Sequence, residues 1–344
     1  MSSAFDDARF ALTVESGAAL ARLREHAGEA VVCTMPEPWA LVADQAPPNL
    51  HTIWVGSMEL AHLREVATTV PDGARIVIGL GGGSSADTAK FVAEATTLPL
   101  LQIPTIISVD AAFTAPYGYR DGSRVRYAGN LRPIEVVADP ALIRLAPAEL
   151  NRAGVGDLVS CHTALHDWRL AVDQGRGDVP WNEEAAALGR GVLDELEEAA
   201  SEIRSVSDEG VRWLATTHRD VGAGCVAWGA RFEEGSEHFL AYAIEWMTGG
   251  HRVHGQLIST CVLAMSFVQG NDPDRAVRVV RACGVAADPS RNLIDEASFA
   301  EALAALPVYA ERERLWPSVI ETVAFTPGLI GEAWAHLLGA TGSP

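Results

Sequence analysis

The chain has 344 residues, of which 48% are hydrophobic and 21% are charged, a composition typical of folded globular proteins and unlike that of disordered or fibrous chains. Its formal net charge of −19 at pH 7 argues against nucleic acid or an acidic membrane as a partner, because both require a basic face. A chain of this length is expected to form two moderate domains.

Short β-rich runs alternate with helical stretches from about residue 30 to residue 140. In chain order, strands are predicted at 30–35, 52–56, 74–80, 100–104 and 133–139, and helices over 58–70 and from Ser85 onward. This alternation predicts an α/β unit with a parallel, Rossmann-like sheet and helices on its faces.

After Pro147 the strand signals vanish, and long segments rich in alanine and leucine with acidic faces follow. This second half is predicted to be all-α. The prolines and capping residues of 140–150 favour a boundary there, which gives an α/β domain over 1–146 and a helical domain over 147–344. Two domains imply a cleft between them, and ligands usually bind in such clefts.

Residues 1–17 are acidic and lack the basic and apolar regions of a signal peptide, and no apolar run is long enough to span a membrane. The five cysteines are widely spaced and form no Cys-x-x-Cys pair, which favours free thiols over a thiolate metal site or a redox pair. We therefore expect a cytoplasmic protein that is not inserted in a membrane.

The segment 79–91, GLGGGSSADTAKF, lies between a predicted strand and a predicted helix. Glycines at such a junction let the backbone approach a phosphate, with N–H groups and the helix N-terminus supplying positive charge. Gly79 and Gly81 fit the first two positions of the Rossmann fingerprint and Ser84 the third, but no acidic residue follows about twenty residues later. We interpret the segment as a diphosphate cradle, with a tight connector as the alternative.

One lysine and three arginines are cationic side chains of interest in the first half of the chain. Lys90 is the only lysine of the chain, which reflects either a role beside the glycines or a lysine-poor composition. Arg120, Arg124 and Arg126 could bind a substrate phosphate, since guanidinium groups match such oxyanions. The Asp-Gly pair among them is also a hairpin signal, and we favour a turn flanked by solvated charges.

Histidines and a carboxylate of the second half offer a metal site. Asp157 follows a Gly-Val-Gly run, His238 lies in GSEHF, and His251 and His254 lie in GGHRVHGQ. Two imidazoles and one carboxylate leave a coordination position open for water or substrate, as a catalytic zinc site requires. Asp157 could equally be the N-cap of a helix.

The spacing of the other histidines leaves a second ligand set open. His162 and His166 could share one face of a helix at i, i+4, with Asp167 beside them. His62 and His218 are interpreted as packed or solvated side chains, because an isolated histidine on a helix rarely binds a metal.

Five ordered motifs resemble the glycerol dehydrogenase and iron-type alcohol dehydrogenase superfamily, which has a dehydroquinate synthase-like architecture. They are GLGGGSSADTAK (79–90), IPTIISVDAAFT (103–114), AGVGDLVSCHTALHDW (153–168), GSEHF (235–239) and HGQLIST (254–260). The Gly-x-Gly-Asp and Asp-Trp elements of the third motif, with ERERLWPSVIE (311–321), are most similar to sn-glycerol-1-phosphate dehydrogenases.

The resemblance implies a metal-dependent, NAD(P)-linked oxidoreductase that interconverts a small polyol or polyol phosphate and its ketone. It implies these roles: Gly81, Gly82, Gly83 and Ser84 at the NAD(P) diphosphate; Thr105, Ser108 and Thr114 at the nicotinamide; Asp110 at substrate hydroxyls; and Asp157, His238 and His254 as ligands of one divalent ion, with zinc preferred. It disfavours the pair of His162 and His166 as metal ligands. It also suggests a homo-oligomer.

Two departures from the family pattern weaken the assignment of a phosphorylated substrate. Tyr242 stands where the glycerol-1-phosphate enzymes place a second histidine that touches substrate, and Gln256 stands where glutamate commonly follows His-Gly. Asp110 and Tyr242 are our candidates for orienting hydroxyls or passing protons, with structural hydrogen bonding as the alternative for each.

The choice of cofactor and of enzyme class stays open. The first predicted strand ends without an acidic residue for a ribose and without an arginine for an extra phosphate, so NAD and NADP both remain possible. Alternatives are a sugar-phosphate cyclase of the dehydroquinate synthase type, a dehydrogenase of another small alcohol or aldehyde, and a non-catalytic relative. The cyclases have a lysine-rich pocket, which a chain with one lysine cannot build.

Overall fold

The computed structural model describes residues 3–122, 124–177, 179–250 and 252–342. Its first half is built on a six-stranded sheet in the order β1-β8-β5-β4-β2-β3, in which all neighbours are parallel. The strands are β1 (Ala11–Val14), β2 (Ala30–Thr34), β3 (His51–Trp54), β4 (Ile76–Gly81), β5 (Leu100–Pro104) and β8 (Glu135–Ala138).

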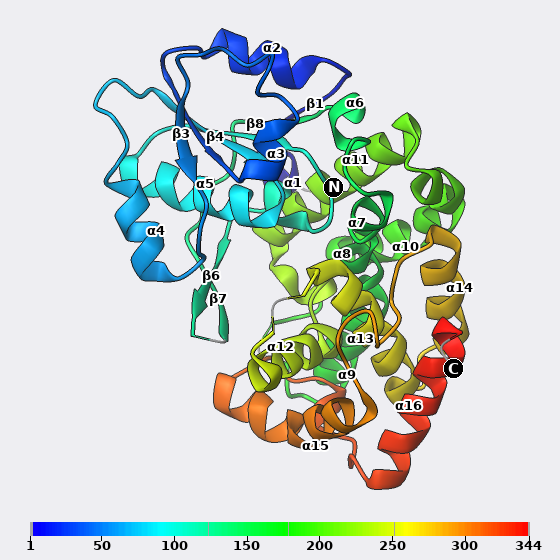
Figure 1. The fold of residues 1–344 in the computed structure, drawn as a ribbon. Helices are drawn as coiled ribbons and strands as arrows, with labels where there is room; N and C mark the ends of the chain where they lie inside the picture. Colours follow the sequence, from blue (N-terminus) through cyan, green and yellow to red (C-terminus); the bar gives the residue numbers. More distant parts are fainter. Residues whose placement is uncertain (1–2, 123, 178, 251, 343–344) are drawn as a thin grey trace.

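Three neighbouring inner strands, β5, β4 and β2, are buried along their whole length. They read as continuous apolar runs because helices cover both faces of the sheet. One face packs against α2 (Ala18–Glu25) and α3 (Pro36–Ala40), and the other against α4 (Leu60–Ala67) and α5 (Gly83–Thr96). Figure 1 shows this half at the upper left.

The predicted α/β class and parallel sheet are confirmed, and the five predicted strands correspond to β2, β3, β4, β5 and β8. Strand β1 was not predicted. It has four residues, none of them buried, and pairs only with β8 at the sheet edge, so it carries little periodic signal.

An antiparallel hairpin formed by β6 (Tyr117–Asp121) and β7 (Arg124–Ala128) leaves the sheet half and projects toward the helical half (Figure 1). Asp121 pairs with Arg124 across the turn, and Gly122 adopts a φ of 62°, a conformation that favours glycine. The predicted hairpin is therefore confirmed.

All elements described after β8 are helices, as predicted for the second half. They are α6 (Pro140–Ile143), α7 (Ala148–Arg152), α8 (Val155–Val159), α9 (Cys161–Asp173), α10 (Glu183–Ser205), α11 (Asp208–Trp228), α12 (Ser236–Thr248), α13 (His254–Gln269), α14 (Pro273–Cys283), α15 (Glu296–Glu313) and α16 (Pro327–Thr341), with 3-10 turns at η2 (Ala230–Phe232) and η3 (Val319–Glu321). A further 3-10 turn, η1 (Asp110–Phe113), lies earlier in the chain, between β5 and β6. The short N-terminal helix α1 (Ser3–Ala8) packs on α11.

Helix α13 lies at the centre of this half and is buried without interruption from Gly255 to Ser266. It contacts α8, α9, α12, α14 and α16. A helix that is apolar on all sides needs such a position. The largest hydrophobic cluster includes α13 and reaches the sheet through Val136 and Ala138 of β8, so the two halves share a core.

The five cysteines are free thiols, as expected. In the parts of the chain that the structure describes, no helix combines the length and hydrophobicity needed to cross a bilayer.

Candidate active site

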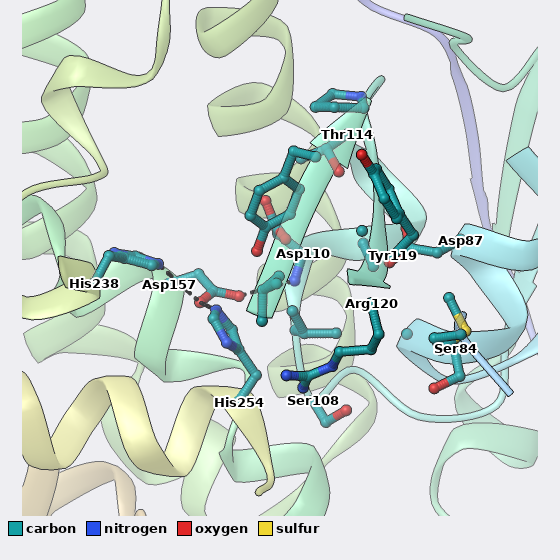
Figure 2. A pocket seen from close by; sticks show the side chains of 18 of the residues that line it. Ser84, Asp87, Ser108, Asp110, Thr114, Tyr119, Arg120, Asp157, His238 and His254 are labelled. Carbon is teal, nitrogen blue, oxygen red and sulfur yellow. Dashed lines mark hydrogen bonds and ion pairs between the residues drawn. The ribbon is translucent and has the colours of Figure 1, made fainter. Parts of the chain in front are cut away.

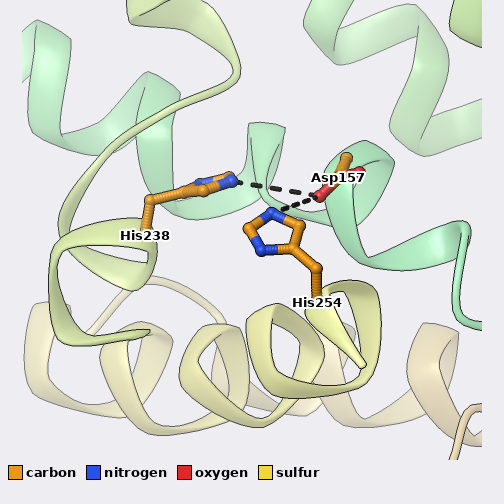
Figure 3. A group of neighbouring side chains, drawn as sticks. All are labelled: Asp157, His238 and His254. Carbon is orange, nitrogen blue, oxygen red and sulfur yellow. Dashed lines mark ion pairs between the residues drawn. The ribbon is translucent and has the colours of Figure 1, made fainter. Parts of the chain in front are cut away.

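Three helices bring Asp157, His238 and His254 together (Figure 3). One ligand atom from each lies within 4.8 Å of the others, and among the described residues this is the one cluster of histidine, cysteine and carboxylate side chains with such spacing. Asp157 Oδ1 is 3.3 Å from His254 Nε2 and 3.9 Å from His238 Nε2. This buried oxygen accepts no hydrogen bond, which is a reason to expect a cation there.

Close contact between the backbones of α8 and α13 sets this geometry. A Cβ atom on Gly156 would overlap with the carbonyl of Gly255, and a Cβ atom on Gly255 would overlap with the carbonyl of Ala153. Because both positions are glycine, the helix that carries Asp157 can lie directly against the first turn of the helix that His254 begins.

The carboxylate of Glu237 orients His238. Its Oε1 is 2.9 Å from His238 Nδ1, which leaves Nε2 directed at Asp157. Burial lowers the pKa of His238, but the hydrogen bond and charge of Glu237 outweigh burial and raise that pKa to about 10. For Asp157, burial opposes ionisation, but the charges of the two histidines prevail and lower its pKa. A carboxylate behind a histidine is the usual support of a metal ligand.

The three side chains face a cavity of about 960 Å³ between the sheet half and the helices. Figure 2 shows them on one side of this cavity and Ser84 and Asp87 on the other, with Asp110 between. The predicted site residues that line it are Gly83, Ser84, Ser108, Asp110, Thr114, Asp157, His238, Tyr242 and His254. Of the other predicted contacts, Gly81, Gly82 and Thr105 are not among the described lining residues.

The glycine segment forms the turn from β4 into α5. Gly81 ends the strand with a φ of 148°, and a Cβ atom there would overlap with the hydroxyl of Ser85. Gly82 is the N-cap of α5, and no side chain caps this helix. The N–H groups of its first turn, next to Ser84, are therefore available to an anionic group in the cavity. Thr105 is buried behind the turn, where its N–H donates to the carbonyl of Gly81.

Asp110 connects the two sides of the cavity. Its backbone N–H donates to Asp157 Oδ2 at 2.9 Å, which holds that carboxylate with its other oxygen toward the histidines. Burial, followed by the charge of Asp157, raises the pKa of the Asp110 carboxyl to about 7.

Lys90 is a structural residue rather than a cavity side chain. It is fully buried, and its Nζ donates to the carbonyl of Pro116 at 2.6 Å and to Thr114 Oγ1 and Asp87 Oδ1 at 3.2 Å each. Its position beside the glycines thus serves to fix residues 114–116 to α5.

Tyr242 lies beside the candidate metal ligands. Its ring centroid is 6.0 Å from that of His238, and its hydroxyl donates to Glu234 Oε1 at 2.9 Å. Burial and the charge of Glu234 raise the pKa of Tyr242 well above its ordinary value. Gln256, the second departure from the family pattern, is buried in α13 and is not among the described lining residues.

The sequence analysis missed Glu233, Glu234 and Glu245 as cavity residues. The one available signal was the pair of glutamates, Glu233 and Glu234, directly before the GSEHF segment. A pair of carboxylates is ordinary on a helical surface, so it did not stand out.

The hairpin arginines are partly exposed, and each is also paired with a carboxylate, which the expectation of solvated charges did not include. Arg120 pairs with Glu245 at 3.0 Å, and Arg126 and Arg124 lie 2.8 and 3.8 Å from Glu313. The hairpin contacts α12 and α15, and its arginines form ion pairs with carboxylates that are far away in the sequence. Burial opposes ionisation of Glu313, but Arg312 and Arg126 lower its pKa.

The rival ligand set has other partners. His162 Nε2 is 2.7 Å from the carbonyl of Asn271, and the Asp167 carboxylate accepts the N–H groups of Ser236 and Val319 at 2.8 Å each. Asp167 therefore fixes the starts of α12 and η3. Among the described residues, His166 is not part of the cluster of possible metal ligands.

The structure also bears on the interpretations of Asp157, His218 and His62. The N-cap of α8 is Gly154, so the interpretation of Asp157 as an N-cap is wrong. His218 is packed as expected, with Nε2 at 3.0 Å from the carbonyl of Gly154 and a pKa lowered to about 4 by burial. His62 is half-buried on α4, and His251 lies outside the described residues.

Residues 19–147 match the model of a family described as iron-containing alcohol dehydrogenase. The chain is similar to glycerol-1-phosphate dehydrogenases (NAD(P)+): that of Hyperthermus butylicus is 34% identical over 61% of this chain and 60% of the relative, and that of Methanosphaerula palustris is 31% identical over 70% and 67%. The chain spans about three fifths of the length of the first of these relatives.

The fold is similar to that of solved dehydrogenase structures. A probable glycerol dehydrogenase from Sinorhizobium meliloti gives a TM-score of 0.72 with 21% identity over 97% of both chains. Glycerol dehydrogenase from Schizosaccharomyces pombe gives 0.73 with 19% identity over 97% of this chain and 90% of that one. At such identities the likeness concerns the fold alone.

Proposed function

This chain belongs to the iron-containing alcohol dehydrogenase family, and on that premise we propose that it is a metal-dependent, NAD(P)-linked oxidoreductase that interconverts a small polyol or polyol phosphate and its ketone. The observation that carries the proposal is the common cavity: the cluster of Asp157, His238 and His254 faces the same space as the uncapped start of α5. Such an arrangement can hold a metal and a dinucleotide against one substrate carbon.

The residues present suit both groups. Asp157 Oδ1 and the Nε2 atoms of His238 and His254 would hold one divalent ion, and a donor set of two nitrogens and one oxygen suits zinc. The N–H groups of α5 at Gly83 and Ser84 would bind the diphosphate of NAD or NADP. When bound, the ion supplies a Lewis acid and the nicotinamide exchanges a hydride with the substrate.

The chain's own groups would position the substrate. Glu237 would keep His238 Nδ1 protonated and its ring fixed. Ser108 and Thr114 line the cavity where the nicotinamide would lie, and Asp110 lies between the two binding regions, where its carboxyl would orient a substrate hydroxyl. The turn from β4 into α5 would be shaped by Gly81, Gly82 and Thr105, which do not line the cavity themselves.

Other predictions from the sequence belong to the same proposal. The α/β part over 1–146 would act as the nucleotide-binding domain and 147–344 as the metal- and substrate-binding domain. We also propose a cytoplasmic homo-oligomer. The cyclase alternative is disfavoured because the sole lysine is buried and bound to Thr114 and the Pro116 carbonyl.

An absorbance assay tests the proposal. The zinc-loaded protein is incubated with NADH or NADPH and with dihydroxyacetone, dihydroxyacetone phosphate and a panel of small aldehydes and ketones. Stoichiometric oxidation of the reduced cofactor with at least one carbonyl compound is the expected result. If the metal-loaded protein oxidises neither cofactor with any of them, or instead releases a carbocycle from a sugar phosphate, the proposal is wrong.

A further inference from the structure

The cavity wall carries more carboxylates than cations. The described lining residues with acidic side chains are Asp87, Asp110, Asp157, Glu233, Glu234 and Glu245. Besides the two candidate histidine ligands, the cationic side chains among them are Arg120 and Arg252. A phosphorylated substrate would bring a further negative charge into this space.

Both arginines are already engaged by protein acceptors. Arg120 Nη1 is 3.0 Å from Glu245 Oε2. Arg252 donates through Nε to the carbonyl of Asn292 at 2.6 Å and through its Nη atoms to Thr248 Oγ1 and the carbonyls of Gly250 and Leu293. A substrate phosphate would therefore have to compete with these acceptors for either guanidinium group.

Glu234 is an acidic residue of this wall whose carboxylate contacts Tyr242, next to the candidate metal ligands. It is half-buried, and it has no ion pair with any described residue. Tyr242 donates to Oε1, and no described donor contacts Oε2. Through Tyr242 the carboxylate adjoins His238, since the two rings lie with centroids 6.0 Å apart.

A carboxylate with a vacant acceptor atom binds the O–H groups of a ligand and repels a phosphate. We propose that Glu234, together with the phenol of Tyr242, is a specificity-determining site that binds a hydroxyl of an uncharged polyol or hydroxyketone beside the metal ligands and disfavours the phosphorylated analogue. This inference rests on the proposed function for the identity of the reacting ligand. It departs from the relatives named for glycerol 1-phosphate.

Two conservative variants separate the charge of Glu234 from its hydrogen bonding. Glu234→Gln keeps the size and one acceptor oxygen but removes the charge, whereas Tyr242→Phe removes the phenol and leaves the charge. Glu311→Gln, an exposed residue of α15, is the control for loss of one negative charge elsewhere. If one variant fails to fold, the other still tests the site.

The measurement is a ligand-detected NMR titration of the zinc-loaded protein with glycerol and with glycerol 1-phosphate, which does not depend on turnover. In the unchanged protein, glycerol is expected to bind at least as tightly as its phosphate. Glu234→Gln should shift the ratio of the two affinities toward the phosphate by about tenfold or more, as expected for one nearby charge. Tyr242→Phe should weaken glycerol without improving the phosphate, and Glu311→Gln should change neither.

The inference is overturned if the unchanged protein binds the phosphate at least tenfold more tightly than glycerol, if it binds neither ligand, or if Glu234→Gln leaves the ratio unchanged. A parallel assay of NAD(P)H oxidation with dihydroxyacetone and its phosphate separates the two proposals. The expected binding pattern without any turnover would contradict the dehydrogenase activity and support the hydroxyl site. Turnover with a strong preference for the phosphate would support the dehydrogenase activity and contradict the hydroxyl site.

Discussion

The two walls of the cavity are built in different ways. On the sheet side, a contiguous segment of β4 and α5 offers backbone N–H groups and small side chains around Gly83 and Ser84. On the helical side, Asp157, His238 and His254 come from three helices separated in sequence, and they offer charged or metal-binding groups. The comparison suggests a division of labour: the first wall should control cofactor affinity and the second metal binding.

The largest effect is expected at the helical wall. His254→Ala removes one of the three candidate ligands, so metal affinity should fall by at least about 100-fold and turnover should be lost with it. His162→Gln is the matched control, because His162 lies outside the cluster and contacts Asn271. For both variants, metal analysis after dialysis against a weak chelator measures metal retention, and the absorbance assay measures turnover. Full metal retention and activity in His254→Ala would refute the ligand assignment.

A backbone change should disturb the same wall without touching a ligand. In Gly255→Ala, the added methyl group would overlap with the carbonyl of Ala153 and push α13 away from α8. The free energy of unfolding should fall by about 1–3 kcal/mol, as in other overpacked sites, and metal affinity should decrease. Denaturant unfolding measures the first effect and metal titration the second.

Gly331→Ala provides the control for that variant. Gly331 lies in α16, and a Cβ atom there would meet nothing within 4 Å, so alanine should leave stability unchanged or raise it by up to about 1 kcal/mol. Equal stability of the Gly255 variant and the Gly331 variant would mean that the contact between α8 and α13 is not tight.

The sheet wall should respond through the cofactor. Ser84→Asp places a negative charge at the uncapped start of α5, which suits the helix but repels a diphosphate. The dissociation constant for NAD(P)H should rise by about 10- to 100-fold with unchanged metal content. Ser84→Asn, which adds similar bulk without charge, should have a smaller effect. Fluorescence titration of the reduced cofactor gives the dissociation constants of both variants. Loss of metal in Ser84→Asp would contradict the proposal that the sheet wall controls only cofactor affinity.

The hairpin joins the two walls, and loosening it should have a modest effect. Glu313→Gln weakens the ion pairs with Arg124 and Arg126, which are about one-third exposed. Such pairs contribute about 1 kcal/mol or less, so the KM for cofactor should rise by no more than about fivefold. The difference from the unchanged protein should vanish at about 1 M salt. A larger, salt-independent loss would indicate a different role for Glu313.

The smallest effect is expected at the sheet edge that carries β1. The hydrogen bonds of Arg22 and Thr13 lower the pKa of Glu135 against the opposing effect of its partial burial. A lowered pKa gives stability that is present above the ordinary glutamate pKa of about 4.3 and is lost as the pH falls through the folded-state value. Glu135→Gln should therefore cost about 1 kcal/mol or less at pH 7 and nothing in strong acid.

Equilibrium unfolding of the unchanged protein and of Glu135→Gln at several pH values checks this prediction. A difference in unfolding free energy that grows as the pH falls would have the wrong sign. It would mean that Glu135 is destabilising when charged.

The sequence predicted the sheet wall more completely than the helical wall, and the reason is physical. A strand, a glycine turn and a helix are contiguous, so their pattern is readable along the chain. The alternation of strands and helices and the family resemblance are confirmed by the fold and by the comparisons. Strand β1 escaped because a short edge strand lacks a buried face.

The helical wall depends on tertiary contacts that no local pattern encodes. Composition and spacing did not distinguish between two candidate sets of metal ligands, Asp157 with His238 and His254 and the set around His162. Only the family resemblance favoured the first set. The approach of α8 and α13 at Gly255 brings the first set together. The pairing of Arg120 with Glu245 also joins distant segments, and sequence reasoning missed it. The contact of Glu234 with Tyr242 is local in sequence, but no pattern of residues marks it.

X-ray absorption spectroscopy at the zinc edge, on protein loaded with one equivalent of zinc, tests the central claim most directly. The account predicts a first shell of two imidazole nitrogens with oxygen ligands, and the loss of one imidazole in His254→Ala. A sulfur ligand, for example from Cys225 of the same cavity, or an unchanged spectrum in His254→Ala would contradict it.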